Sequence, residues 1–191
     1  MLRSQHSFRR QHATRESRGM KPPAPDDESR RIREAAFRLL AVRARTAEEL
    51  RRRLAGKGFA ADLAETVIAD LQADGYQSDE DFARQYAQEK RTRAGWAPAR
   101  VRRELRAKGV QAELAAEVVA NLFVGEDLAA GILPRVLRRW QSSRGLPLET
   151  RRRRLSGYLQ RRGYDWPTIK AVLTAAARAD EHGVQEGSDR D

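Results

Sequence analysis

Apolar residues recur every three or four positions along most of the chain, which is the spacing of a single buried stripe on an α-helix. The clearest series is Leu63, Val67, Ile68 and Leu71, and matching series run from Leu114 to Leu122 and from Ile169 to Ala176. Runs of β-branched residues, which favour strands, are few, whereas Ala, Leu, Arg and Glu are abundant. The pattern therefore predicts an all-α protein.

The helical pattern repeats three times. In each repeat an apolar residue is followed four positions later by leucine and eight positions later by glycine, at Leu50-Leu54-Gly58, Val101-Leu105-Gly109 and Leu155-Leu159-Gly163. A period of about 50 residues indicates an array of similar supersecondary units, and each unit divides into three helices. We therefore expect three tandem three-helix repeats, at residues 34–76, 77–124 and 125–178, that form an elongated, curved, solenoid-like body.

The two ends of the chain lack this pattern. Residues 1–33 are rich in Arg, Gln and Ser and include the run Lys21-Pro22-Pro23-Ala24-Pro25, so we expect a disordered basic tail there. Residues 179–191 are polar, acidic and contain two glycines, so we expect a second, frayed tail.

Cap residues mark helix ends within the repeats. Thr46 and Glu49 form a capping-box pattern, in which each side chain bonds to the backbone N–H of the other residue. Ser78 and Asp165 are expected to be further N-caps. Gly58 is expected to take the left-handed conformation that ends the second helix of the first repeat.

The net charge of the chain indicates what kind of partner it binds. It is +11, and most of it lies in the body, because residues 34–177 carry 27 basic and 18 acidic side chains. A basic body of this kind is typical of proteins that bind nucleic acid or acidic protein surfaces. The basic residues cluster on the second helix of each repeat, and alignment of these helices would create a basic stripe. The candidate binding residues are Arg51, Arg52, Arg53, Lys57, Arg100, Arg102, Arg103, Arg106, Lys108, Arg151, Arg152, Arg153, Arg154, Arg161 and Arg162.

Several kinds of chemistry are not expected. The chain has no cysteine, and its three histidines lie in the predicted tails, so neither a disulfide nor a transition-metal site is predicted. The acidic run Asp79-Glu80-Asp81 fits the first turn of a helix better than a metal site. No phosphate-binding glycine loop and no Ser-His-Asp set occurs in the body, so we expect no cofactor and no enzyme activity.

No apolar run approaches the length of a membrane span, and we expect a soluble cytoplasmic protein.

The few aromatic residues lie near the boundaries between repeats. They could stack on nucleic-acid bases, but packing of one repeat against the next is the favoured role. They are Tyr76, Phe82, Tyr86, Trp96, Trp140, Tyr158 and Trp166.

An ordered set of motifs runs through the first two repeats. It consists of Arg43-Ala44-Arg45-Thr46-Ala47-Glu48-Glu49-Leu50, Lys57-Gly58-Phe59, Asp74-Gly75-Tyr76 and Asp81-Phe82-Ala83, followed by Gly95, Pro98, Arg100, Val101, Leu105, Lys108 and Gly109. In this set the chain resembles the RecX family of recombination regulators, over about residues 34–178.

The resemblance implies a protein that binds the RecA recombinase and lodges in the groove of RecA–DNA filaments. Family members usually block filament growth and lower ATP hydrolysis, strand exchange and co-protease activity, which connects them to DNA repair and the SOS response. We also expect a monomer with weak affinity for single- and double-stranded DNA. Two alternatives remain at this stage: a DNA-binding protein that acts independently of RecA, and an interaction scaffold whose basic stripe only confers solubility.

Overall fold

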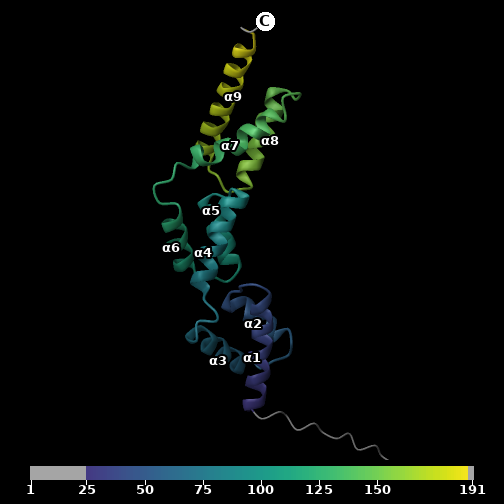
Figure 1. Cartoon of the computed structure of the whole chain (residues 1–191), viewed down its shortest axis with the longest axis vertical. Helices are drawn as coiled ribbons and strands as arrows, with labels where there is room; N and C mark the ends of the chain where they lie inside the picture. Colours follow the sequence, from purple (N-terminus) through teal and green to yellow (C-terminus); the bar gives the residue numbers. More distant parts are fainter. Residues whose placement is uncertain (1–24, 189–191) are drawn as a thin grey trace, which may run out of the picture.

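The computed structural model describes the backbone of residues 25–188 and the side chains of residues 26–180. Within these residues all regular structure is helical, which confirms the predicted fold class. The helices are α1 (Pro25–Val42), α2 (Ala47–Ala55), α3 (Ala61–Ala73), α4 (Asp79–Glu89), the π-helix η1 (Lys90–Ala94), α5 (Pro98–Ala107), α6 (Ala112–Leu122), α7 (Leu128–Gln141), α8 (Leu148–Gln160) and α9 (Trp166–Ser188). Figure 1 shows them as three groups placed end to end in an elongated molecule.

Each group of three helices buries its own core. Leu50, Leu54 and Ile68 are fully buried between α1, α2 and α3, and separate clusters lie within α4–α6 and α7–α9. The extensive helix–helix packing also lies within the groups. The apolar stripes of the sequence therefore hold the three repeats together internally, and they do not join one repeat to the next.

The predicted N-caps are present. The side-chain oxygens of Thr46, Ser78 and Asp165 accept hydrogen bonds from the backbone N–H groups three residues later, at 3.0–3.1 Å. The second half of the capping box is wrong, because the Glu49 carboxylate does not reach back to Thr46. It instead pairs with the guanidinium groups of Arg43 and Arg45.

Both helical ends extend further than the sequence pattern predicts. Helix α1 begins at Pro25, so residues 25–33 are helical and not disordered. Ile32 is fully buried, and Arg33 pairs with Asp74 at 2.5 Å, which ties this turn to the repeat. At the other end, α9 continues to Ser188, so most of the predicted acidic tail is helical. The rest of the two predicted tails, residues 1–24 and 189–191, lies outside the described residues.

The repeats meet at the ends of their second helices. The end of α5 contacts the start of α2, where the Thr46 hydroxyl donates to the Lys108 carbonyl at 2.6 Å. The end of α8 contacts the start of α5 in the same way, where the Ala97 N–H donates to the Arg162 carbonyl at 2.9 Å. The second helices of the three repeats are therefore aligned end to end along the molecule.

Glycines make this close approach possible. Gly58, Gly109 and Gly163 all have positive φ, between +82° and +89°, as predicted for Gly58. A Cβ atom at Gly109 would lie 2.3 Å from the Glu48 Cβ, and one at Gly163 would lie 2.6 Å from the Arg100 Cβ. Gly58, at the free end of the first repeat, has no described atom within 4 Å of that position. The positive φ angle explains why glycine occupies all three positions. At Gly109 and Gly163 the close contact with the neighbouring repeat also leaves no room for a side chain.

A buried ion-pair cluster stabilises the turn between α1 and α2. Glu49 and Arg45 are both buried, and Arg43 reaches the same carboxylate at 2.5 Å. Burial opposes ionisation of Glu49, but the two guanidinium groups outweigh this effect and hold the pKa of the carboxyl below its usual value.

We expect Glu49→Gln to lower the free energy of unfolding by about 3 kcal/mol, because Arg45 would remain buried without its carboxylate. The ionised form stabilises the fold above its unfolded pKa of about 4.3, and this contribution is lost as the pH falls through the lower folded-state pKa. Urea unfolding near neutral pH and at about pH 2 should therefore show a smaller difference between wild type and variant at the acidic pH.

The matched control is Glu65→Gln, which removes an exposed ion pair with Arg51 and should cost less than about 1 kcal/mol. A Glu49→Gln effect that stays constant as the pH is lowered would contradict the assigned role of the carboxylate.

Candidate functional site

An open groove lined by arginines lies on α5. Its volume is about 510 Å³, and its lining consists of Arg102, Arg103 and Arg106 together with the small residues Ala99 and Ala107. The three arginines are exposed. Glu104 lies 3.9 Å from Arg103, whereas Arg102 and Arg106 form no ion pair with any described carboxylate. The groove therefore presents uncompensated guanidinium groups, which suit phosphates and carboxylates.

On α2, ion pairs with carboxylates occupy two of the predicted basic residues. Arg52 is exposed and has no described carboxylate partner. Arg51 is held by both oxygens of Glu65, at 2.5 and 2.7 Å, and these hydrogen bonds raise the pKa of its guanidinium. Arg53 is exposed and lies 3.9 Å from Glu49, and Lys57 is exposed at the free helix end. Arg52 and Lys57 are thus the cations of α2 that remain available to a partner.

Arg151 on α8 is not a surface residue. Only 7% of it is exposed, and its guanidinium donates to the Trp140 carbonyl and to Asp180, both at 3.0 Å. It also lies over the Trp140 ring, 4.2 Å from the ring centroid. Because this cation is used inside the third repeat, we remove Arg151 from the predicted binding residues.

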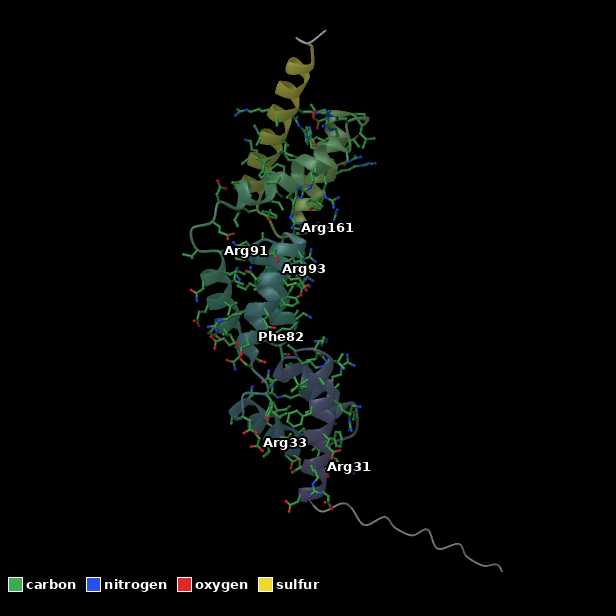
Figure 2. All side chains as sticks on the ribbon, viewed as in Figure 1. Arg31, Arg33, Phe82, Arg91, Arg93 and Arg161 are labelled. Carbon is green, nitrogen blue, oxygen red and sulfur yellow. The ribbon has the colours of Figure 1, made fainter. Side chains whose placement is uncertain are left out.

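The remaining arginines of α8 are mostly exposed. Arg152 pairs with Glu149 at 3.2 Å, whereas Arg153, Arg154 and Arg161 form no ion pair with a described carboxylate. Figure 2 places Arg161 at the end of α8 that meets α5. The surface of α8 is therefore basic near both ends of the helix.

Two arginine positions of α2 recur on α5 but not on α8, and the position directly before the glycine is basic in all three repeats, at Lys57, Lys108 and Arg162. Arg51 and Arg52 stand seven and six residues before the glycine of their repeat, and Arg102 and Arg103 occupy the same two positions. On α8 these positions hold Ser156 and Gly157. Arginines at these two positions are therefore shared by α2 and α5 alone.

Three predicted binding residues lie at the joints and pack on aromatic rings. Arg100 lies 4.1 Å from the Trp96 ring centroid, Lys108 lies 5.0 Å from that of Tyr86, and Arg162 lies 3.7 Å from that of Tyr158. Each is only partly exposed. Their cation–π contacts indicate a structural role beside any role in binding.

Packing of one repeat against the next, the predicted role of the aromatic residues, is wrong for Trp140 and Tyr158, which are 1% and 8% exposed and lie in the core inside the third repeat. Phe82 is also buried and stacks on Tyr86, with ring centroids 5.8 Å apart. Trp166 differs, because 61% of it is exposed.

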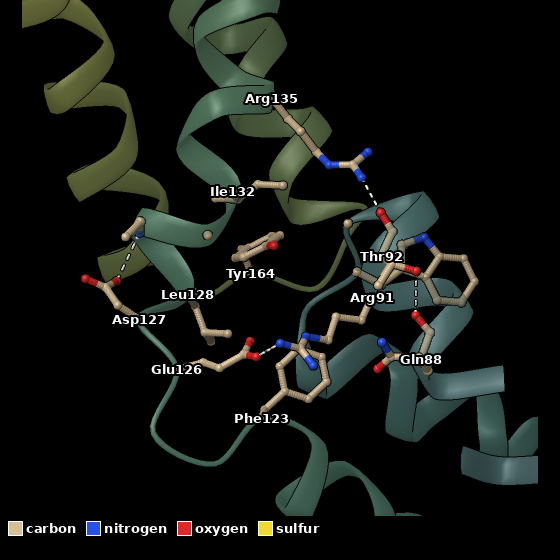
Figure 3. Close-up of a pocket in the computed structure, with 14 residues that line it drawn as sticks. Gln88, Arg91, Thr92, Phe123, Glu126, Asp127, Leu128, Ile132, Arg135 and Tyr164 are labelled. Atoms are coloured by element: carbon tan, nitrogen blue, oxygen red, sulfur yellow. Dashed lines mark hydrogen bonds and ion pairs between the residues drawn. The ribbon is translucent and has the colours of Figure 1, made fainter. Parts of the chain in front are cut away.

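Sequence reasoning missed the arginines of α7 and η1 that gather at the joint between the second and third repeats. Arg135 donates to the Arg93 carbonyl at 3.1 Å and to the Thr92 carbonyl, and Arg91 pairs with Glu126 (Figure 3). Arg91, Glu126 and Arg135 line a cavity of about 560 Å³ at this joint. Because Arg91 and Arg135 are far apart in the sequence, no local pattern predicts that they meet.

The charges in this cavity are largely compensated. Glu126 neutralises Arg91, and the guanidinium of Arg135 is occupied by backbone carbonyls. Tyr164 lies in the same cavity, and burial raises its pKa to about 12, so its phenol stays neutral. The arrangement suits a joint between repeats better than a ligand site.

Two other classes of site receive no support in the described part of the chain. No group of three or more potential metal-ligating side chains occurs among these residues. The helices described here include none long and apolar enough to cross a membrane.

Comparison with known proteins identifies related chains. Three RecX family models match: the first three-helix domain at residues 33–71, the second at 78–119 and the third at 136–173. A regulatory protein RecX from Amycolatopsis mediterranei (strain U-32) is 36% identical over 168 residues, which is 86% of this chain and 94% of that protein. One from Mycobacterium avium (strain 104) is 36% identical over 163 residues, covering 83% and 93% of the two chains.

A solved structure has the same fold. The crystal structure of RecX from Lactobacillus salivarius matches with a TM-score of 0.68 at 16% sequence identity, over 80% of this chain and 98% of that one.

Proposed function

Since the chain belongs to the RecX family, we propose that it binds RecA and RecA–DNA filaments and lowers the recombinase, ATPase and co-protease activities of RecA. The observation that carries this proposal is the arginine groove on α5, in which Arg102 and Arg106 lack a described carboxylate partner, together with the unpaired Arg52 on α2. A RecA–DNA filament offers DNA phosphates and acidic protein surface along a groove, and such surfaces suit a linear array of guanidinium groups.

The shape of the molecule supports the same proposal. The repeats touch through a few contacts at helix ends and keep separate cores. A long array of this kind fits a long groove better than a compact pocket, and one molecule bound at a growing filament end would stop all later addition. We propose that the protein acts in this way as a cytoplasmic monomer without catalytic activity.

The test is the single-strand-dependent ATP hydrolysis of RecA, measured with this protein below stoichiometry at two salt concentrations. We expect a decrease in hydrolysis that is weaker at high salt, because the contacts are ionic. The decrease should be larger when the protein is present during filament growth than when it is added to finished filaments.

One alternative is favoured by the α5 groove itself, which would also suit the phosphates of free DNA. An electrophoretic shift assay with naked DNA, run in parallel, separates the two functions. Unchanged ATP hydrolysis together with tight binding to naked DNA would support a DNA-binding protein that acts without RecA.

A further inference from the structure

A second basic cavity lies within the third repeat, between the end of α7 and one face of α8. Its volume is about 210 Å³. Arg139 contributes from α7, and Arg154, Tyr158 and Arg161 contribute from α8, at spacings of four and three residues that place them on one helix face. Ser142 and Ser143 complete the polar part of the lining.

The charge of this cavity is not compensated. Arg139, Arg154 and Arg161 are exposed and form no ion pair with a described carboxylate, and no carboxylate lines the cavity. Arg151 forms part of the wall, is nearly fully buried, and has a buried Nε with no hydrogen-bond partner. The described lining therefore offers several N–H donors and a clear excess of positive charge.

The cavity is also preorganised. The ring of Tyr158 is buried between Arg139 and Arg162, which lie 4.3 and 3.7 Å from its centroid. The hydroxyls of Ser142 and Ser143 donate to carbonyls in the last turn of α7 at 2.9–3.0 Å. These hydrogen bonds cover the negative end of the helix, which would otherwise repel an anion.

The excess of positive charge also affects Arg162, which lies beside the cavity. The pKa of Arg162 is lowered, first by burial and then by repulsion from Arg139, Arg100 and Arg135, although the ring of Tyr158 opposes the shift. Guanidinium groups from both sides of the joint thus converge on one region of the surface.

We propose that this cavity binds a phosphate monoester or diphosphate group. Guanidinium groups form paired, charge-assisted hydrogen bonds with phosphate oxygens, and a dianion matches three unpaired cations better than the single charge of an internal phosphodiester does. The volume is below the 300–1,000 Å³ or so of pockets that enclose a whole small molecule, so the phosphoryl group enters and the rest of the ligand stays outside. The site goes beyond the proposed function because it requires no RecA.

The first probe is inorganic pyrophosphate, titrated into the full chain by isothermal calorimetry at low salt. We expect saturable binding that weakens on the order of tenfold in Arg154→Gln and in Arg139→Gln, because each change removes a charge-assisted donor. The matched control is Arg138→Gln, which removes the same charge from an exposed neighbour of Arg139 that does not line the cavity. Circular dichroism of each variant verifies the fold, and Arg154→Gln keeps the test valid if Arg139→Gln loosens the contact with Tyr158.

The second probe separates the possible sources of the group. A thymidine oligonucleotide with a 5′-phosphate is compared with the same strand bearing a 5′-hydroxyl, and ADP is tested alone. Preference for the 5′-phosphate identifies a nucleic-acid end, and binding of ADP alone identifies a free nucleotide. Either result supports the site.

Three outcomes would overturn the proposal: no saturable binding of pyrophosphate, an equal loss in Arg138→Gln, or equal affinity for both oligonucleotides without binding of ADP. None of these outcomes depends on RecA, so a failure here is distinct from a failure of the ATPase test.

Discussion

Gly109→Ala is expected to destabilise the protein more than Gly58→Ala, although the two glycines share nearly the same backbone conformation. Their φ angles are +89° and +82°, so an alanine side chain costs roughly 1–2 kcal/mol at either position. At Gly109 the new Cβ would also overlap the Cβ of Glu48, which cannot rotate away. Such overpacking adds roughly 1–3 kcal/mol, unless the joint opens to relieve it.

Two measurements together decide the outcome. Chemical denaturation compares the free energies of unfolding of the two variants, and small-angle X-ray scattering compares their overall shapes. We expect Gly109→Ala to show the larger loss of stability, a changed scattering profile, or both, whereas Gly58→Ala keeps the wild-type shape. Two variants with equal stability and unchanged profiles would show that the contact between Gly109 and Glu48 does not fix the joint.

The functional consequence follows from the alignment of α2 and α5. The end-to-end placement of these helices includes the contact between the Thr46 hydroxyl and the Lys108 carbonyl. A joint opened by Gly109→Ala should therefore weaken RecA inhibition more than Gly58→Ala does, even where both variants remain folded.

Local features of the sequence predicted much of this fold because their causes are local. The N-caps at Thr46 and Ser78 and the left-handed glycines depend on neighbouring backbone groups only. The start of α1 had local signals too, with Pro25 followed by Asp26, Asp27 and Glu28 in the first turn. The proline-rich run before them led to the expectation of a disordered tail, and the ion pair between Arg33 and Asp74, which are far apart in sequence, could not be predicted from local signals.

The roles of individual arginines depend on tertiary structure. Residues 151–154 are four consecutive arginines, and composition cannot distinguish them. Only the packing of α8 against Trp140 and Asp180 turns Arg151 inward and leaves Arg153 exposed. Arg51 is similar, because its partner Glu65 comes from the next helix. The sequence therefore predicted the basic second helix of each repeat, and the structure shows which of its arginines are held by internal contacts and which remain exposed without a carboxylate partner.

The α5 groove allows the sharpest test of the proposed function. We expect the triple variant Arg102→Gln, Arg103→Gln and Arg106→Gln to raise the concentration needed for half-maximal inhibition of RecA ATP hydrolysis on the order of tenfold or more, because each arginine offers a charge-assisted contact. If these contacts are made to phosphate, the plot of the logarithm of the binding constant against the logarithm of the salt concentration should also become less steep. Its slope should change by up to about one unit per arginine removed. Since all three side chains are exposed, stability should change by no more than about 0.5 kcal/mol per site.

A second triple variant separates position from net charge. Arg30→Gln, Arg38→Gln and Arg84→Gln remove the same charge from exposed positions on α1 and α4, where each arginine already lies beside a carboxylate. General electrostatic attraction to a polyanion would respond equally to both triple variants, because it depends on total charge. A docked groove would respond to the first alone, because its three arginines line the groove, and two of them, Arg102 and Arg106, lack a described carboxylate partner. Equal loss of inhibition in the two triple variants would therefore exclude the α5 groove as the contact surface. A loss confined to the first triple variant would place the binding partner at the α5 groove.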